Sequence, residues 1–345
     1  MQRLIQTDRR FFHGKRLIAD YAAFDLQARR VAAWLVAHHL RPGDRVEIFM
    51  RNDPAYLILL NGIWYAGGVA VPINAKLHSK EAAFIIADSG STLVFAAASL
   101  ALELERQEGL PPVIRVPGPD FDAITTAAPE LNVVPRQAED MAWLFYTSGT
   151  TGRPKGVIIT HGMLMSMALC YETDVDRVQP QDATLYAAPL SHGAGLYNLM
   201  HVRRAARHVI PASGGFDPAE IFDLAAHFRE IHMFAAPTMV KRLTEYGRAH
   251  DQRGTGLRSV TYAGGPMYTA DILAAVCWFG QIFVQIYGQG ECPMGITASS
   301  KRRVYARGVV LFRLAVTHLS DKTGEPLGTD ITSFICFGAV RAPST

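Results

Sequence analysis

Hydrophobic positions along the chain alternate between a helical spacing and short extended runs. The first helix is predicted from an apolar stripe at steps of four, three and four, formed by Phe24, Ala28, Val31 and Leu35. Apolar runs bounded by Gly, Pro, Asn or Asp predict strands. These strands are expected at residues 46–50, 69–71, 92–95, 141–145, 157–159, 185–187, 231–236, 259–262 and 282–286.

Signals for helix starts lie between several of these runs. Asn52-Asp53-Pro54 puts a capping side chain before a proline in the first turn, and Asp217-Pro218-Ala219-Glu220 has the form of a capping box. Ser79 is expected to cap a helix that reaches about residue 88, and residues 270–279 are predicted as another helix. Alternating strands and helices predict an α/β fold with parallel sheets covered by helices.

Two stretches depart from this alternation of strands and helices. The run from Tyr56 to Ile73 is almost wholly apolar, which raises the alternative of a membrane span. Gly67-Gly68 and Pro72 favour a buried helix followed by a buried strand instead. Residues 109–140 contain Pro117-Gly118-Pro119 and acidic side chains, and they are predicted to form a looser connection.

Composition narrows the class of protein. A chain of 345 residues is long enough for two or more subdomains, and 49% hydrophobic with 19% charged residues is typical of a globular protein. The formal net charge of +3 is too small to favour nucleic acid as the main partner. Four cysteines without metal-ligand spacing, and an N-terminus without an apolar leader, favour a cytoplasmic protein with reduced cysteines.

The most informative segment is polar and stands between two strands that are both expected to be buried. Residues 146–156 read Tyr-Thr-Ser-Gly-Thr-Thr-Gly-Arg-Pro-Lys-Gly. Glycine lets the backbone approach an anion, successive N–H groups can surround phosphate oxygens, and Lys155 adds a positive charge. The segment therefore predicts a site for a nucleotide polyphosphate, with a flexible surface turn as the alternative. It is not a P-loop, because Lys155 is followed by Gly156 and a strand instead of Ser or Thr and a helix.

Three more polar loops follow predicted strands. They read Pro189-Leu190-Ser191-His192-Gly193-Ala194-Gly195, Ala263-Gly264-Gly265-Pro266 and Tyr287-Gly288-Gln289-Gly290-Glu291. In open α/β sheets, ligands bind beyond the carboxyl ends of the strands. We therefore expect these loops and the glycine-rich segment to share one crevice.

Together these four motifs resemble the adenylate-forming superfamily of AMP-dependent synthetases and ligases, and within it the acyl-CoA synthetases. The motifs occur in the family's order, between about residues 20 and 340. The resemblance implies two layered α/β subdomains with mostly parallel sheets, at about residues 1–185 and 186–300 of a truncated AMP-binding domain. Residues 301–345 would begin a small β-barrel-like subdomain, and the family's C-terminal lid domain would be absent.

The activity implied by the resemblance is the ATP-dependent activation of a small-molecule carboxylic acid. The carboxylate attacks the α-phosphate of ATP to give an acyl-adenylate and pyrophosphate, and the thiol of coenzyme A then displaces AMP. Such a reaction depends on positioning and on neutralising charge. The residues that would hold the β- and γ-phosphates are Thr147, Ser148, Gly149, Thr150, Thr151, Gly152 and Lys155.

The same resemblance gives roles to the other motifs. Glu291 would bind Mg2+, which prefers oxygen ligands, so Thr147, Lys155 and Glu291 are the expected catalytic residues. His192 would lie at the mouth of the acyl pocket, and Ala235 would help to shape that pocket. The adenine pocket, in which a tyrosine would stack on the base, would be lined by Gly264, Gly265, Pro266, Tyr287 and Gly288.

Each of these roles has a structural alternative. Glu291 could be an ordinary surface glutamate, Tyr287 a core residue and His192 a hydrogen-bonded loop histidine. Residues 264–266 could form a tight turn, which is compatible with a place in the adenine pocket.

Two features depart from the family's pattern. Gly290 stands where the family usually has a threonine, so one hydroxyl donor to the α-phosphate is missing. A donor aimed in this way stabilises a transition state by about 3 kcal/mol. The family's ribose-binding aspartate, hinge arginine and lysine-bearing C-terminal domain are also not found before Thr345, although residues 321–327 resemble the segment that precedes them. Weak or no adenylation by this chain alone is the resulting expectation.

Two other classes compete with a ligase. Gly290 is compatible with a catalytically silent protein that binds nucleotide or a partner protein. A P-loop ATPase is disfavoured because the Gly-Lys-Ser/Thr signature is missing. The sequence leaves the acid open between fatty, aromatic and sterol-type acids, and it leaves the oligomeric state open.

Overall fold

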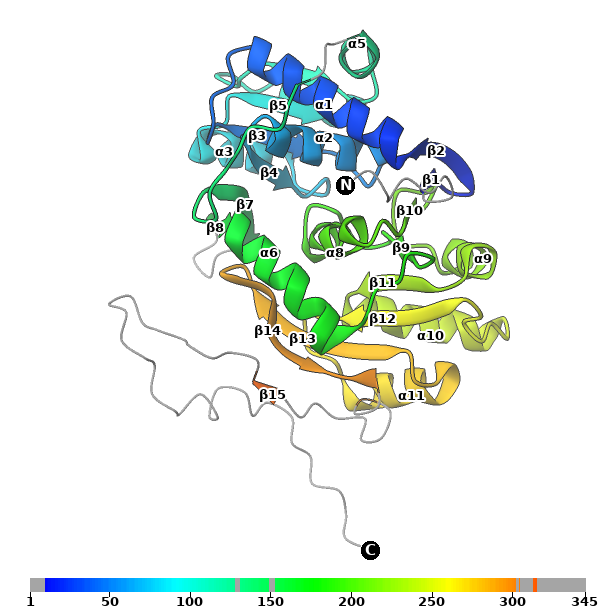
Figure 1. Cartoon of the computed structure of the whole chain (residues 1–345). Helices are drawn as coiled ribbons and strands as arrows, with labels where there is room; N and C mark the ends of the chain where they lie inside the picture. Colours follow the sequence, from blue (N-terminus) through cyan, green and yellow to red (C-terminus); the bar gives the residue numbers. More distant parts are fainter. Residues whose placement is uncertain (1–9, 128–130, 149–152, 302–303, 305–312, 315–345) are drawn as a thin grey trace, which may run out of the picture.

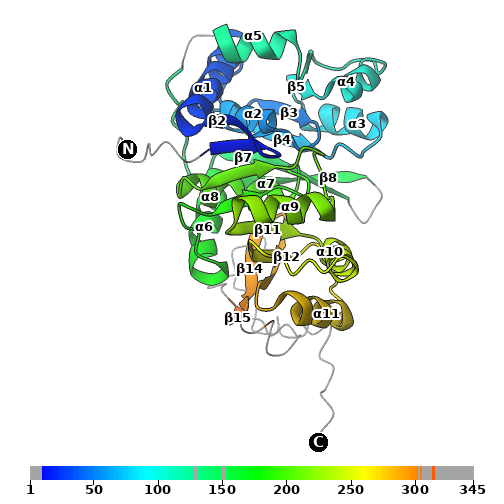
Figure 2. The same cartoon turned by 90° about the vertical axis from the view of Figure 1, so that its right-hand side faces the viewer.

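Two β-sheets with helices around them make up the computed structural model of the chain (Figure 1 and Figure 2). The structure describes residues 10–127, 131–148, 153–301, 304 and 313–314. The predicted α/β class with mostly parallel sheets is confirmed. The β-barrel-like subdomain expected at residues 301–345 lies largely outside the described residues, and the proposed subdomain bounds stay a prediction.

The smaller sheet is formed by the first half of the chain. Its neighbouring strands run parallel, except that β7 and β8 form an antiparallel hairpin. Across the sheet the strands are β6 (Val113–Arg115), β5 (Leu93–Ala96), β3 (Arg45–Phe49), β4 (Val69–Ile73), β7 (Met141–Ser148) and β8 (Pro154–Thr160).

The larger sheet combines the second half of the chain with the first two described strands. Six of its strands are parallel, while β2, β14 and β15 are antiparallel to their neighbours. Across the sheet the strands are β15 (Arg313–Leu314), β14 (Cys292–Ser299), β13 (Phe283–Gln289), β12 (Leu257–Tyr262), β11 (Ile231–Ala235), β9 (Ala183–Leu185), β10 (Arg207–Ile210), β1 (Arg10–His13) and β2 (Arg16–Asp20).

Helices cover both sheets. In Figure 1 and Figure 2, α9, α10 and α11 lie along one side of the larger sheet, and α6 lies on the other side. The helices are α1 (Tyr21–Ala37), α2 (Pro54–Tyr65), α3 (Ser79–Ser89), α4 (Ala98–Leu104), α5 (Pro119–Ala127), α6 (His161–Cys170), α7 (Gly193–Leu196), α8 (Asn198–Arg203), α9 (Pro218–Phe228), α10 (Pro237–Ala249) and α11 (Thr269–Phe279). A π-helical turn, η1 (Tyr171–Val175), continues α6.

The predicted helix starts at Pro54 and Pro218 are confirmed, but the capping box expected at residues 217–220 is only half formed, because the Glu220 carboxylate accepts the N–H of Ala212 instead of that of Asp217. The stripe from Phe24 to Leu35 is buried along α1, and Asp53 and Asp217 each accept a backbone N–H in the first turn of α2 and α9. The prediction for Ser79 was wrong by one residue, because His78 caps α3. The His78 ring accepts the N–H of Lys80, while Glu81 accepts the N–H of His78.

The long apolar run is a buried helix and a buried strand, as predicted, since it forms α2 and β4. Among the described residues no helix is both long and apolar enough to cross a membrane. The segment 109–140 was predicted to be a looser connection, but it contains β6 and α5. Phe121 and Ile124 of α5 pack into the core, which holds this helix against the rest of the protein.

One hydrophobic cluster spans the two sheets. Val31 of α1, Ile48 of β3 and Trp143 of β7 belong to the same buried cluster as Tyr186 and Leu190, which follow β9 of the larger sheet. Continuous packing of this kind fixes the two sheets relative to each other. The loops at the carboxyl ends of both sheets are therefore held in a defined relation.

Candidate functional site

Two of the predicted phosphate-binding residues, Thr147 and Lys155, share one face of the β7–β8 hairpin. Thr147 of β7 lies directly opposite Lys155 of β8, and Phe145 lies opposite Val157. Side chains directly opposite each other in an antiparallel pair point to the same side, and so do residues two apart along a strand. Thr147, Lys155, Phe145 and Val157 therefore share a face. Ile159, the next residue of β8 on this face, is fully buried.

The turn between β13 and β14 packs against this face. A Cβ built on Gly290 would lie 3.1 Å from Cγ2 of Val157 and 3.2 Å from its Cβ. Glu291 follows Gly290 directly, and Lys155 is two residues before Val157 on the same face, so both sequence motifs converge here. Figure 1 shows the β7–β8 hairpin next to the turn between β13 and β14. Lys155 and Glu291 are both exposed.

His192 reaches the same face from the larger sheet. Its ring lies edge-on to Phe145, with 5.6 Å between the ring centroids, and its Nδ1 lies 3.0 Å from the Ser191 hydroxyl. Burial lowers the pKa of His192, which favours the neutral imidazole. The predicted place beside the glycine-rich segment is consistent with this contact, and a role toward an acyl group stays a prediction.

Asn52 holds the His192 loop, and the sequence reasoning gave it no part in the site. Its amide nitrogen donates to the carbonyls of Tyr186 and Ala188, both at 2.8 Å, and its amide oxygen accepts the N–H of Leu190 at 2.8 Å. The side chain is 7% exposed and fully hydrogen-bonded to the loop. In the sequence, Asn52 stands out only as part of a helix-start signal directly before Asp53. Its hydrogen-bond partners lie more than 130 residues away and leave no local pattern.

The strands that lead to the predicted adenine-binding residues end at the same edge of the larger sheet. Ala235 of β11 pairs with Tyr262 of β12, and Tyr262 pairs with Gln285 of β13, all in parallel register. The loop that begins at residue 263 and the end of β13 near Tyr287 therefore lie side by side at one edge of the sheet.

The conformation of this loop explains its glycines. Gly264 has φ +83° and open space around it, whereas a Cβ on Gly265 would lie 3.9 Å from the ring of Pro237. Gly264, Gly265 and Pro266 are exposed, and the Tyr287 side chain is 46% exposed, which excludes the core alternative for Tyr287. Ala235 is fully buried in the core of the larger sheet.

Several expectations need correction or lie outside the description. Gly149, Thr150, Thr151 and Gly152 lie outside the described residues. Of the two strands expected to be buried around them, β7 is largely buried, but β8 is half exposed, with Ile158 at 53%. Tyr287, Gly288 and Gln289 belong to β13 and not to a loop, because β14 pairs with them as an unpredicted antiparallel partner.

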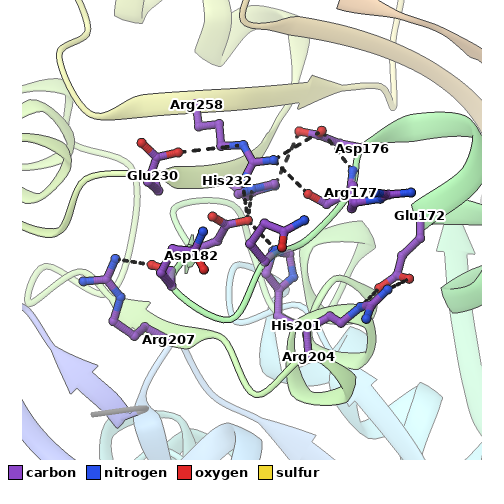
Figure 3. A network of polar contacts seen from close by, with 12 residues as sticks. Glu172, Asp176, Arg177, Asp182, His201, Arg204, Arg207, Glu230, His232 and Arg258 are labelled. Atoms are coloured by element: carbon purple, nitrogen blue, oxygen red, sulfur yellow. Dashed lines mark hydrogen bonds and ion pairs between the residues drawn. The ribbon is translucent and has the colours of Figure 1, made fainter.

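A second polar cluster lies at the opposite ends of the strands (Figure 3). Asp182, just before β9, is fully buried and hydrogen-bonds to Nε2 of His232 on β11 at 3.0 Å and to Arg258 on β12. Asp176 bonds to Lys301 at 2.9 Å and lies 3.7 Å from the other ring nitrogen of His232. We call these five residues the buried ion network.

The charges of this network are balanced within it. Burial alone would raise the pKa of Asp182, but hydrogen bonds from His232 and the Gln179 N–H, with the charge of Arg258, hold that pKa below its usual value. Burial lowers the pKa of the adjacent His201 to about 3. In the described part of the chain, no group of three or more His, Cys, Asp or Glu side chains could hold a metal ion. The network therefore connects the segment before β9 with β11 and β12.

Comparison with known proteins supports the family that the four sequence motifs indicate. Residues 5–339 match the family model described as AMP-binding enzyme. Feruloyl-CoA synthase of an Amycolatopsis species is 32% identical over 316 residues, which cover 89% of this chain and 62% of that protein. The long-chain-fatty-acid–CoA ligase FadD13 of Mycobacterium tuberculosis is 32% identical over 254 residues, covering 72% and 50%. The chain thus spans less than two thirds of these relatives.

Solved structures show the same fold. The N-terminal domain of FACL13 from Mycobacterium tuberculosis superposes with a TM-score of 0.75 at 26% identity, covering 86% of this chain and 76% of that one. ATP-bound MatB from Rhodopseudomonas palustris gives a TM-score of 0.77 at 27% identity and covers 94% and 66%.

Proposed function

The chain belongs to the family of AMP-binding enzymes, and we propose that it carries the ATP-binding part of an acid–thiol ligase. In this reaction an oxygen of a carboxylate attacks the α-phosphorus of ATP, and the bond to the departing pyrophosphate breaks. The sulfur of coenzyme A then attacks the carbonyl carbon of the acyl-adenylate, and AMP leaves. The relatives named above act on different acids, so the proposal extends to a carboxylic acid and no further.

The β7–β8 face supplies the groups for the first step in this proposal. Lys155 neutralises charge on the β- and γ-phosphates, and the Thr147 hydroxyl donates to the same group, because both side chains point to one side of the hairpin. Ser148, Gly149, Thr150, Thr151 and Gly152 are proposed to bind the same phosphates, as the sequence motif implies. A polyphosphate between these groups is oriented before the carboxylate attacks, which is the main contribution a protein makes to such a transfer.

Glu291 fits a magnesium ion in this arrangement. Mg2+ is usually held by one or two carboxylates together with substrate phosphates, so a single exposed glutamate beside the lysine hairpin is a suitable donor. When bound, the ion withdraws negative charge from the phosphates. The exposed glycines at 264 and 265, with Pro266, Tyr287 and Gly288, provide a flat, open edge for the adenine.

The observation that carries the proposal is the contact between Gly290 and Val157. It joins the hairpin of Lys155 to the turn of Glu291, although more than a hundred residues lie between them in the sequence. A lysine and a carboxylate on adjoining turns match the needs of a magnesium–triphosphate group.

ATP binding tests the proposal directly. Calorimetric titration of the 345-residue chain with ATP is expected to show one site whose affinity rises when Mg2+ is present and falls when Lys155 is replaced by Ala. Absence of any ATP binding to the folded wild-type chain would refute the proposal. Pyrophosphate release with a panel of fatty, aromatic and sterol-type acids then measures adenylation.

One observation favours a second candidate function, a protein that binds nucleotide without turning it over. Gly290 offers no hydroxyl to the α-phosphate at the turn that also carries Glu291. ATP titration together with the pyrophosphate assay distinguishes the two functions, because a silent protein would bind Mg·ATP and release no pyrophosphate with any acid. We further propose a cytoplasmic location, reduced cysteines and no nucleic-acid partner, in keeping with the low net charge.

A further inference from the structure

We propose that Asp88 is a positioning residue for the phosphate site, acting through Tyr146 to fix the strand that carries Lys155. This inference rests on the proposed function, and Asp88, at the end of α3, lies in none of the four sequence motifs. The Tyr146 hydroxyl donates to Oδ2 of Asp88 at 2.6 Å. The two residues are 58 positions apart, so this hydrogen bond ties α3 to the β7–β8 hairpin.

Tyr146 supports the hairpin from the side away from the proposed phosphates. It lies directly opposite Gly156, next to the pair formed by Thr147 and Lys155. Successive side chains of a strand point to opposite faces, so Tyr146 points away from the face that Thr147 and Lys155 share. On its own side it packs into the buried cluster that contains Ile85 and other side chains of α3.

The Tyr146 ring lies across the backbone beside Lys155. A Cβ built on Gly156 would be 3.2 Å from Cζ of Tyr146 and 3.3 Å from its hydroxyl oxygen. An aromatic ring that covers a cross-strand glycine supplies the packing that the glycine lacks. Because residue 156 is bonded directly to Lys155, a shift of the ring is passed on to the strand at the position of the lysine.

The hydrogen bond to Asp88 is of the strong kind. Burial and the Asp88 carboxylate raise the pKa of Tyr146, so the phenol keeps its proton and donates it to a charged acceptor. The distance of 2.6 Å lies in the range of charge-assisted O–H···O⁻ bonds. Since the Tyr146 side chain is 8% exposed, water competes little for its hydroxyl.

The other end of this bond is fixed through the residues that follow Asp88. The hydroxyls of Ser89 and Ser91 each donate to Oε1 of Glu47 at 2.9 Å, and Glu47 is fully buried on β3. Arg45 of the same strand donates to the Ser89 carbonyl and to the next carbonyl, both at 2.8 Å. Burial raises the pKa of Glu47 to about 8, so its carboxyl is mainly neutral at pH 7 and needs no cation beside it. Asp88 is thus presented from a fixed point of the smaller sheet.

The proposed role predicts which ligands respond to the loss of this bond. Lys155 is proposed to meet the β- and γ-phosphates of ATP, which AMP lacks. A misplaced hairpin should therefore weaken the binding of Mg·ATP and spare that of AMP. A variant that only unfolds more readily would lose both ligands alike.

A double-mutant cycle tests the role of Asp88. Tyr146→Phe, Asp88→Ala and the double variant are titrated by calorimetry with ATP in the presence of Mg2+ and with AMP, and their urea unfolding is measured without ligand. Each single variant should weaken Mg·ATP binding about three- to tenfold and leave AMP binding within about twofold of the wild type. The double variant should be no weaker than either single variant, because both remove the same bond. Asp88→Asn keeps an acceptor oxygen and should retain most of the Mg·ATP affinity.

A matched control is offered by a second bond between a tyrosine and an aspartate. The Tyr65 hydroxyl, at the end of α2, donates to Oδ1 of Asp25 on α1 at 2.9 Å. Tyr65→Phe therefore deletes the same chemical group away from the hairpin. It should leave the ratio of ATP to AMP affinity unchanged, whatever it does to urea unfolding.

The outcomes separate this proposal from the proposed function. If the wild-type chain binds Mg·ATP and Tyr146→Phe binds it equally well, the role of Asp88 is overturned and the proposed function stands. Equal losses of ATP and AMP affinity, or an effect on urea unfolding alone, make the bond merely structural and also overturn the role. A wild-type chain that binds no ATP overturns the proposed function, and the role of Asp88 falls with it.

Discussion

Two polar regions of this protein are built on opposite plans. The buried ion network ties Asp182 and Asp176 to cations on neighbouring elements of the larger sheet, and its carboxylates are buried or nearly so (Figure 3). Lys155 on β8 and Glu291 in the turn between β13 and β14 are instead exposed. The region with more ion pairs is therefore the one that stabilises, and the region with exposed charges is the one suited to a charged ligand.

The physical reason is the cost of removing charge from water. A buried charge is tolerated only when the protein supplies partners for it. An exposed charge costs the fold little, and it contributes energy only when a ligand arrives. The predictions that follow test this division, beginning with the largest effect.

Replacing Asp182 by Ala should lower the free energy of unfolding by about 3–5 kcal/mol, because Arg258 and His232 would lose a fully buried partner. Urea unfolding measures the change. Glu105→Ala, which removes an exposed ion pair with Arg115, should cost less than about 1 kcal/mol. The Mg·ATP affinity of the folded Asp182→Ala variant should match that of the wild type. A strong loss of affinity would contradict the division between stabilising charges and ligand-binding charges.

Replacing Asn52 by Ala should lower the free energy of unfolding by about 2–3 kcal/mol, since three buried hydrogen bonds to the loop after β9 are lost. It should also raise the concentration of acid needed for half-maximal pyrophosphate release, because the His192 loop is no longer held. Asn61→Ala is the control, as Asn61 is equally buried but bonds only to Leu57 one turn away. Equal effects of both variants on the acid dependence would refute the role of Asn52.

Replacing Lys155 by Ala should weaken Mg·ATP binding about 10- to 100-fold, the range expected for a charge-assisted hydrogen bond. The free energy of unfolding should change by less than about 0.5 kcal/mol, because the residue is exposed. Calorimetry and urea unfolding on the same samples give both numbers. Lys15→Ala removes another exposed positive charge and should leave ATP binding intact. The reverse pattern would place Lys155 among the stabilising charges.

A pH dependence of stability is also expected, and it comes from the buried side. The pKa of His201 is lowered to about 3 by burial and by the nearby His232, so between pH 6.5 and 3 the unfolded chain binds a proton that the folded chain does not. Stability should therefore fall as pH drops below 6.5. The lowered pKa values of Asp176 and Asp182 add a further loss below pH 3.8.

His201→Gln should reduce the fall in stability between pH 7.5 and 4.5, measured by urea unfolding at several pH values. His250→Gln is the matched control. Each histidine bonds through Nδ1 to the carbonyl four residues earlier, at 2.7 Å for His201 and 3.0 Å for His250, but only His201 is buried. An equal effect of both variants would show that burial is not the cause.

Local signals in the sequence predicted much of the fold. Apolar spacing predicted α1, α2 and most of the parallel strands, and proline with aspartate marked the starts of α2 and α9, because these features depend on neighbours within a few residues. Short elements such as α7 and β6, and the antiparallel strand β14, were missed. Their stability comes from packing and strand pairing with distant segments, which leave no periodic pattern.

For the site, the sequence by itself determined the chemical groups: a glycine-rich segment with Lys155, a glycine turn at 264–265, and Glu291. Composition and motif order were enough because backbone freedom and charge are properties of single residues. Only the tertiary structure decided that the turn carrying Gly290 packs against Val157, two residues from Lys155, and that Asn52 holds the His192 loop. Contacts between residues more than a hundred positions apart are settled by how two sheets pack, and no local pattern encodes that distance.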